Sequence, residues 1–95
     1  MEVDEKFDDK IMALIAGAVP GKFRKTKITR ETHLQKQLGL DSIGVVALVF
    51  RFEELFSIDI TQMGIEVDIA KIKTVADVLS VARDILSKAS VAREA

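Results

Sequence analysis

The segment from Ile43 to Phe56 constrains the fold of this chain most, because it is apolar on more than one side. It contains no proline and a single glycine, Gly44, so it is predicted to be a helix. At about 100° per residue, one face collects apolar side chains that a small domain would bury against its other helices. These side chains are Val45, Leu48, Val49, Phe52, Leu55 and Phe56.

The opposite face of this helix also carries apolar side chains. Its residues are Ile43, Val46, Ala47 and Phe50, beside Arg51, Glu53 and Glu54. A chain of 95 residues cannot easily surround a whole helix, so we expect Ile43, Val46 and Phe50 to be exposed. An exposed apolar patch is typical of a surface that binds a partner.

Two further amphipathic helices are predicted. The first ends at Pro20 and Gly21, and its apolar residues recur at steps of three and four: Val3, Phe7, Ile11, Leu14, Ile15 and Ala18. The last begins at a capping pair, Thr74 and Asp77. Its core stripe is Val75, Val78, Leu79, Ala82, Ile85, Leu86 and Ala89.

Two connections separate the predicted helices. Residues 21–41 form a long one, which we expect four apolar residues to pin to the core: Phe23, Ile28, Leu34 and Leu38. In residues 61–73, apolar and polar residues alternate with the period of a strand. Because a lone strand would lack a partner, we expect this segment to be irregular, with at most one or two helical turns.

Composition narrows the class of protein. The chain has no cysteine, which excludes a disulfide framework and a zinc ribbon, and no metal site is expected. It has no run near the roughly 20 apolar residues that span a bilayer, and its acidic start is unlike a secretory signal. We therefore expect a cytoplasmic protein without a membrane span, with residues 1–95 forming one domain whose ordered core covers about 3–88.

Asp41 and Ser42 stand directly before the central helix, where such residues are commonly N-caps. A catalytic role for Ser42 is disfavoured, because the only histidine is His33 and a catalytic serine needs a base and an orienting group. The glycine spacing also differs from a nucleophile elbow, since Gly39 lies three residues before Ser42. Ser42 is more consistent with a cap or an attachment point.

The surroundings of Ser42 resemble the acyl carrier protein family. The family signature is a Leu-Gly-Leu-Asp-Ser run followed by Leu or Ile and a helix that ends in Glu-Glu-x-Phe. It is matched here by Leu38, Gly39, Leu40, Asp41, Ser42 and Ile43, then Glu53, Glu54 and Phe56. The resemblance extends from about Ile28 to Leu86 through Thr32, Leu34, Ile58 to Ile60, and Thr74-Val75. It implies an all-α fold, a small four-helix bundle with a long first loop and a short or irregular third helix.

The resemblance also implies a function. Ser42 would carry 4′-phosphopantetheine from coenzyme A, Asp41 would help to present it, and the terminal thiol would hold acyl groups as thioesters. A chain without cysteine needs such a thiol for this chemistry. The implied protein is a monomeric carrier, not an enzyme, in fatty-acid, lipid or polyketide-type biosynthesis. Its implied partners are a phosphopantetheinyl transferase, an acyl-loading ligase or transacylase, and a ketosynthase or acyltransferase.

Two groups of residues follow from this implied role. The partner-docking candidates are Ile43, Val46, Ala47, Phe50, Glu53 and Glu54. The candidates for an acyl pocket are Leu48, Val49, Phe52, Phe56, Met63 and Ile65. Burying the acyl chain would gain about 0.8 kcal/mol per methylene. Each pocket candidate taken singly is also explained as ordinary core.

The chain departs from the family in charge. Its net charge is only −1, and Gly44, Ala47 and Leu55 stand where the family commonly has acids. We therefore expect a specialised carrier with dedicated partners and weaker charge steering. A basic cluster is interpreted as a solvated loop face or a docking site for an acidic partner, not as a nucleic-acid or membrane site: Lys22, Arg24, Lys25, Lys27 and Arg30.

Two alternative functions remain open at this point. One is a carrier-like interaction module that works through its apolar helix face without modification, and this function would survive Ser42→Ala. The other is an aminoacyl or peptidyl carrier, which shares the helical plan.

Overall fold

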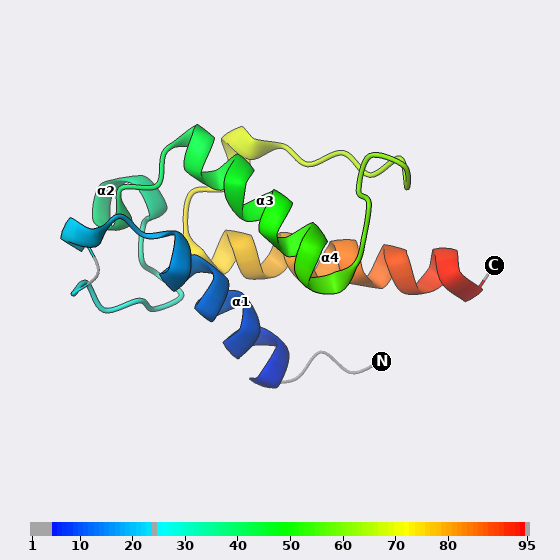
Figure 1. Ribbon diagram of the computed structural model, residues 1–95, viewed down its shortest axis with the longest axis horizontal. Helices are drawn as coiled ribbons and strands as arrows, with labels where there is room; N and C mark the ends of the chain where they lie inside the picture. Colours follow the sequence, from blue (N-terminus) through cyan, green and yellow to red (C-terminus); the bar gives the residue numbers. More distant parts are fainter. Residues whose placement is uncertain (1–4, 24, 95) are drawn as a thin grey trace.

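The structure is a computed structural model that describes residues 5–23 and 25–94. Val3, expected in the first helix, and Arg24, in the basic cluster, lie outside the described residues. The described residues form helices joined by irregular segments, which confirms the all-α class (Figure 1). The elements are α1 (Glu5–Ala18), the 3-10 turn η1 (Gly21–Phe23), α2 (Leu34–Leu38), α3 (Ser42–Phe56), the 3-10 turn η2 (Ile69–Lys71) and α4 (Val75–Glu94).

The three long helices enclose the core. α1 packs against both α3 and α4, and η2 packs against α3. Each long helix contributes its predicted apolar face, because side chains at steps of three and four share one side of a helix. Among the buried residues are Phe7, Ile11 and Ile15 of α1, Val45, Leu48 and Phe52 of α3, and Val75, Leu79, Ala82, Ile85 and Ala89 of α4.

Leu55 was expected in this core, and that expectation is wrong. Its side chain is 48% exposed. At about 100° per residue, Leu55 lies about 55° from the mean direction of the buried residues Val45, Leu48 and Phe52. It therefore lies at the edge of the α1–α3 contact, where it lines a shallow surface groove with Leu14 and Gly17 of α1.

The long connection is held to the rest of the molecule by backbone hydrogen bonds. The carbonyls of Thr32 and Arg30 accept the N–H groups of Val75 and Ala76 at 3.0 and 2.9 Å, which satisfies free donors in the first turn of α4. Leu34 and Leu38 are buried, while Phe23 and Ile28 are partly buried against the core, as predicted. The helix α2 was not predicted, because five residues are too few to show helical periodicity.

The segment between α3 and α4 is irregular, as expected. No strand occurs among its residues, and one 3-10 turn, η2, precedes Ile72. The alternation that resembles a strand has a different origin: Met63, Ile65 and Val67 are partly buried while Gly64 and Glu66 are exposed. Met63 and Gly64 lie in a turn, and the chain after them runs along the core with alternate side chains directed toward it, so a period of two arises without a partner strand.

The predicted capping pair begins α4. Thr74 Oγ1 accepts the N–H of Asp77 at 3.3 Å, and Asp77 Oδ2 accepts the N–H of Thr74 at 3.0 Å. The N–H of Lys73 also donates to Asp77 Oδ2, at 2.9 Å. These bonds from Lys73 and Thr74 lower the pKa of Asp77 because they favour its charged form.

None of the helices within the described ranges is long and apolar enough to cross a membrane.

Candidate functional site

The turn that leads to Ser42 is set by Gly39 and Leu40. Gly39 ends α2 in the left-handed conformation, with φ of 67°. The N–H of Gly39 donates to the Gln35 carbonyl at 3.1 Å, and that of Leu40 donates to the Leu34 carbonyl at 2.9 Å. This C-cap closes α2, and the buried side chain of Leu40 fixes the chain before it enters α3.

Asp41 is the N-cap of α3, as its residue type favours. Its Oδ1 accepts the N–H of Gly44 at 3.0 Å, and its carbonyl accepts the N–H of Val45 at 2.9 Å. Ser42 is then the first residue of α3 and is exposed. Its hydroxyl makes no hydrogen bond with any described residue, so it projects free at the start of the helix.

His33 does not form a catalytic pair with Ser42. It is partly buried and is the N-cap of α2, where its Nδ1 accepts the N–H of Lys36 at 3.2 Å. Its capping role was not predicted, because histidine is an uncommon N-cap. A serine hydrolase is therefore not supported by the described geometry.

An open groove of about 320 Å³ lies beside Ser42. Its apolar surface comes from Leu34, Leu40, Val45, Ile69, Ala70 and Ile72, and its polar residues are His33, Gln35, Lys36, Asp41, Ser42 and Lys73. These residues come from α2, the start of α3, and the segment that runs from η2 to α4. A mixed polar and apolar groove next to a free hydroxyl fits an attached group that is itself partly polar.

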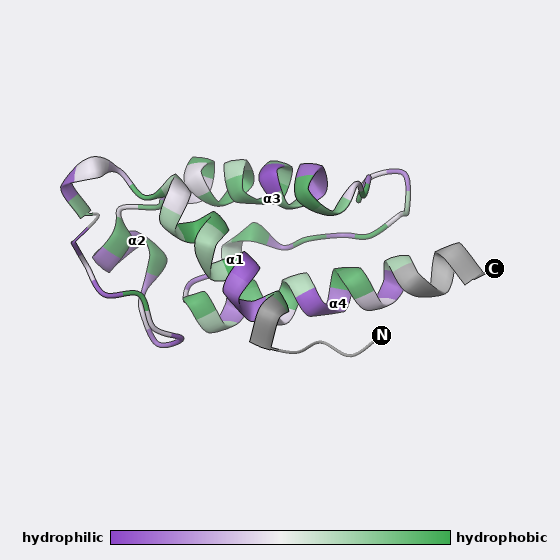
Figure 2. Ribbon diagram, turned by 60° about the horizontal axis from the view of Figure 1, so that its bottom comes forward, coloured by the Kyte–Doolittle hydropathy of each residue, from purple (hydrophilic) through white to green (hydrophobic). Residues whose placement is uncertain are grey.

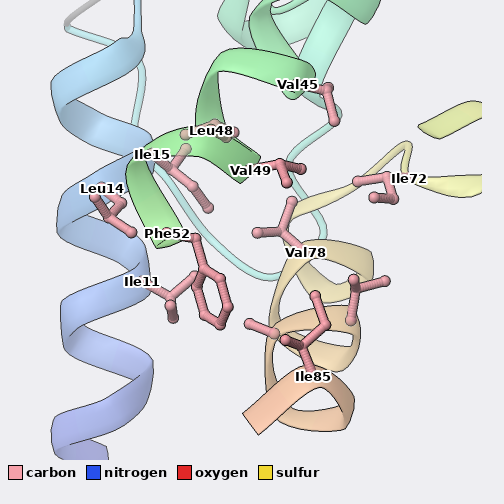
Figure 3. A pocket seen from close by; sticks show the side chains of 12 residues that line it. Ile11, Leu14, Ile15, Val45, Leu48, Val49, Phe52, Ile72, Val78 and Ile85 are labelled. Atoms are coloured by element: carbon pink, nitrogen blue, oxygen red, sulfur yellow. The ribbon is translucent and has the colours of Figure 1, made fainter. Parts of the chain in front are cut away.

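A second cavity lies inside the bundle, between α1, α3 and α4 (Figure 3). Its volume is about 40 Å³ and all of its lining side chains are apolar. Of the pocket candidates, Leu48, Val49 and Phe52 line it. Phe56, Met63 and Ile65 are not among its lining residues; Phe56 instead packs against Phe52, with ring centroids 4.9 Å apart and the ring planes tilted by 48°.

The internal cavity and the Ser42 groove share two lining residues, Val45 and Ile72. Both side chains are buried and stand between the two spaces. An engineered apolar cavity of about 150 Å³ holds one benzene molecule, so a cavity of about 40 Å³ is too small for an acyl chain as it stands. Entry of a chain would require Val45 of α3 and Ile72 of the segment after η2 to move apart.

The second apolar face of α3 is exposed, as predicted. Ile43 is 79% exposed, Phe50 60% and Val46 38%. Figure 2 shows hydrophobic residues along most of α3, with hydrophilic ones confined to its C-terminal half. Ala47 is also exposed, so a continuous apolar strip begins next to Ser42 and runs along the helix.

The two acidic docking candidates differ in what they contact. Glu54 is exposed. Glu53 is partly buried, and its Oε2 accepts the backbone N–H of Ile60 at 2.9 Å. Glu53 therefore holds the loop after α3 in place, a role that its position in the sequence did not reveal.

The basic cluster is divided by the fold. Arg30 pairs with Asp8 of α1 at 2.8 Å, so this member is structural. Lys22 lies over the ring of Phe23, with its Nζ 5.2 Å from the ring centroid. Lys25 and Lys27 are exposed and form no ion pair with a described residue.

Comparison with known proteins identifies a relative. The chain is 33% identical over 79 residues to an acyl carrier protein of Buchnera aphidicola subsp. Baizongia pistaciae, an alignment that covers 83% of this chain and 94% of the relative. No protein-family model matches the chain. No solved structure matches it at a significant level.

Proposed function

Because the chain belongs to the acyl carrier protein family, whose members are carriers and not enzymes, we propose that Ser42 is its loading site. On this proposal, a transferase attaches 4′-phosphopantetheine to the Ser42 hydroxyl, and the terminal thiol carries acyl groups as thioesters. The observation that carries the proposal is the position of Ser42: it is exposed, it is the first residue of α3, and its hydroxyl has no hydrogen-bond partner among the described residues.

The local electrostatics support a phosphodiester at this position. The N-terminus of a helix carries partial positive charge and free N–H groups, both of which favour an anion. The Asp41 carboxylate accepts the N–H of Gly44, and this hydrogen bond orders the turn that presents Ser42. Loading would form a bond from Ser42 Oγ to phosphorus and break the pyrophosphate of coenzyme A, with release of adenosine 3′,5′-bisphosphate and the hydroxyl proton.

The exposed strip of α3 is the proposed docking surface for partner enzymes. Ile43, Val46 and Phe50 supply apolar contacts, with Ala47 and Glu54 beside them. Glu53 is a weaker docking candidate because its carboxylate already binds the loop. With a net charge of −1, apolar contact should contribute more to docking than long-range attraction. The proposed partners are a phosphopantetheinyl transferase, a loading ligase or transacylase, and a ketosynthase or acyltransferase.

The proposed cargo is an acyl group of fatty-acid, lipid or polyketide-type biosynthesis. Leu48, Val49 and Phe52 are the pocket candidates that an acyl chain would meet once it had passed Val45 and Ile72, since they line the internal cavity. Phe56, Met63 and Ile65 would be reached only after the helices move apart. A gain of about 0.8 kcal/mol per methylene could drive such an opening for longer chains.

The test is the intact mass of the protein after incubation with coenzyme A and a broad-specificity transferase. The expected result is a gain of one phosphopantetheine, which disappears in Ser42→Ala and persists in the control Ser80→Ala, an exposed serine of α4. Circular dichroism should show that both variants keep the helical fold. No gain with several transferases would contradict the proposal and favour an interaction module that works through the α3 strip without modification.

A further inference from the structure

We infer that Lys36 and Lys73 hold the prosthetic arm of the loaded protein in the groove beside Ser42. The inference rests on the proposed function and assigns two residues of this chain to the attached group. Between encounters with partner enzymes, the arm lies along the surface of the carrier, with its phosphate paired to these lysines.

The two lysines are brought together by the fold. Lys36 lies on α2 and Lys73 directly before α4, and both line the groove that Ser42 also lines. The segments that carry them are joined by a hydrogen bond from the Leu34 N–H to the Lys73 carbonyl, at 2.9 Å. An isolated bridge between His33 and Thr74 adds to this connection. The groove is therefore bordered by backbone that hydrogen bonds hold in place.

Among the described residues, Lys36 and Lys73 have no carboxylate within ion-pair distance, and the Lys73 charge acts only at longer range, where it adds to the backbone hydrogen bonds that lower the pKa of Asp77. Their ammonium groups form no ion pair there, unlike Lys71, which pairs with Asp68, and Lys88, which pairs with Asp84. Asp41, the acid that lines the groove, uses its Oδ1 to cap α3. A monoanionic phosphodiester on Ser42 would therefore lie in a groove where cationic side chains outnumber carboxylates.

The rest of the groove matches the rest of the arm. Phosphopantetheine has a phosphate, then a branched apolar segment, then two amides before the thiol. The groove offers an apolar floor in Leu34, Leu40 and Ile72, and polar side chains in His33 and Gln35. Its volume of about 320 Å³ is open to solvent, so an arm can lie in it without disturbing the core. The internal cavity of about 40 Å³ offers no such room.

The experiment uses the loaded protein with ¹⁵N in the two amides of the arm. We expect the arm amides of the wild type to show heteronuclear NOE values near those of ordered backbone amides. In Lys36→Gln/Lys73→Gln these values should fall to those of a flexible tether. The amide shifts of Gln35 and Ala70 should move on loading in the wild type but not in this variant. A neutral disulfide reagent should react with the arm thiol several-fold faster in the variant.

The matched control is Lys25→Gln/Lys27→Gln, which removes the same charge from exposed lysines outside the groove. It should leave the arm as ordered as in the wild type. A wild-type arm that is already flexible, or an equal release of the arm in the control, would overturn the inference while the loaded mass still supports the proposed function. Failure to load Ser42 at all would instead overturn the proposed function.

Discussion

At the scale of single residues, Gly39 decides how the chain approaches Ser42. Its φ of 67° disfavours any side chain, and a Cβ at this position would lie 2.5 Å from the ring of Phe23. The ring therefore packs directly on the backbone of the turn before Asp41. This contact connects the first part of the long connection to the loading site.

We predict that Gly39→Ala destabilises the protein by about 2–4 kcal/mol, since backbone strain adds to a clash with the Phe23 ring. Gly64→Ala is the matched control, because its φ is 70° but an added Cβ would meet no atom of a residue beyond its chain neighbours within 4 Å. It should lose only about 1 kcal/mol from backbone strain. Urea unfolding at pH 7 measures both, and equal losses would show that the contact with Phe23 contributes nothing.

At the scale of elements, Glu53 and Glu54 are neighbours with different roles. Glu53 ties the end of α3 to the loop at Ile60, whereas Glu54 has an exposed side chain. We predict that Glu53→Ala lowers the free energy of unfolding by about 1.5–3 kcal/mol, the usual value for a hydrogen bond to a charged group. Glu54→Ala should change it by less than about 0.5 kcal/mol.

Urea unfolding of the two alanine variants, measured side by side, checks this prediction. A loss of stability in Glu54→Ala as large as that in Glu53→Ala would contradict it. The comparison also matters for function, because a partner-binding defect in Glu53→Ala can reflect a displaced loop. Glu54→Ala is the cleaner variant for studying an acidic docking contact.

At the scale of the whole molecule, one carboxylate joins three parts of the chain. Asp8 of α1 binds Arg30 of the long connection at 2.8 Å and also binds Arg83 of α4. The Asp8 side chain is only 13% exposed, so solvent screens these pairs less than pairs on the open surface. This ionic cluster holds the connection against α1 and the middle of α4.

We predict that Asp8→Asn costs about 1–3 kcal/mol, between the values for exposed and buried ion pairs. It should also speed hydrogen exchange at the amides of Val75 and Ala76, whose N–H groups bind the connection. Asp84→Asn, which removes an exposed ion pair with Lys88, is the control. It should change neither the free energy of unfolding nor the hydrogen exchange at these two amides. Unchanged exchange at both amides in Asp8→Asn would show that the cluster does not anchor the connection.

Much of the fold was predictable because helical periodicity is a local property. The buried faces of α1, α3 and α4, the cap at Thr74 and Asp77, and the exposure of Ile43 and Phe50 follow from residue type and spacing. The predictions from sequence fail where the spacing of apolar residues does not decide the structure. Leu55 lies at the edge of a face, and α2 is too short to show a period.

The sequence by itself determined the helical class, the family resemblance and Ser42 as the proposed loading site, because these depend on neighbours along the chain. Only the tertiary structure decided that Glu53 binds a loop, that Asp8 joins two arginines, and that Lys36 and Lys73 share a groove with Ser42. The physical reason is distance along the chain. Hydrogen bonds, ion pairs and grooves form between segments that meet only after folding, and no local pattern specifies which polar groups will meet there.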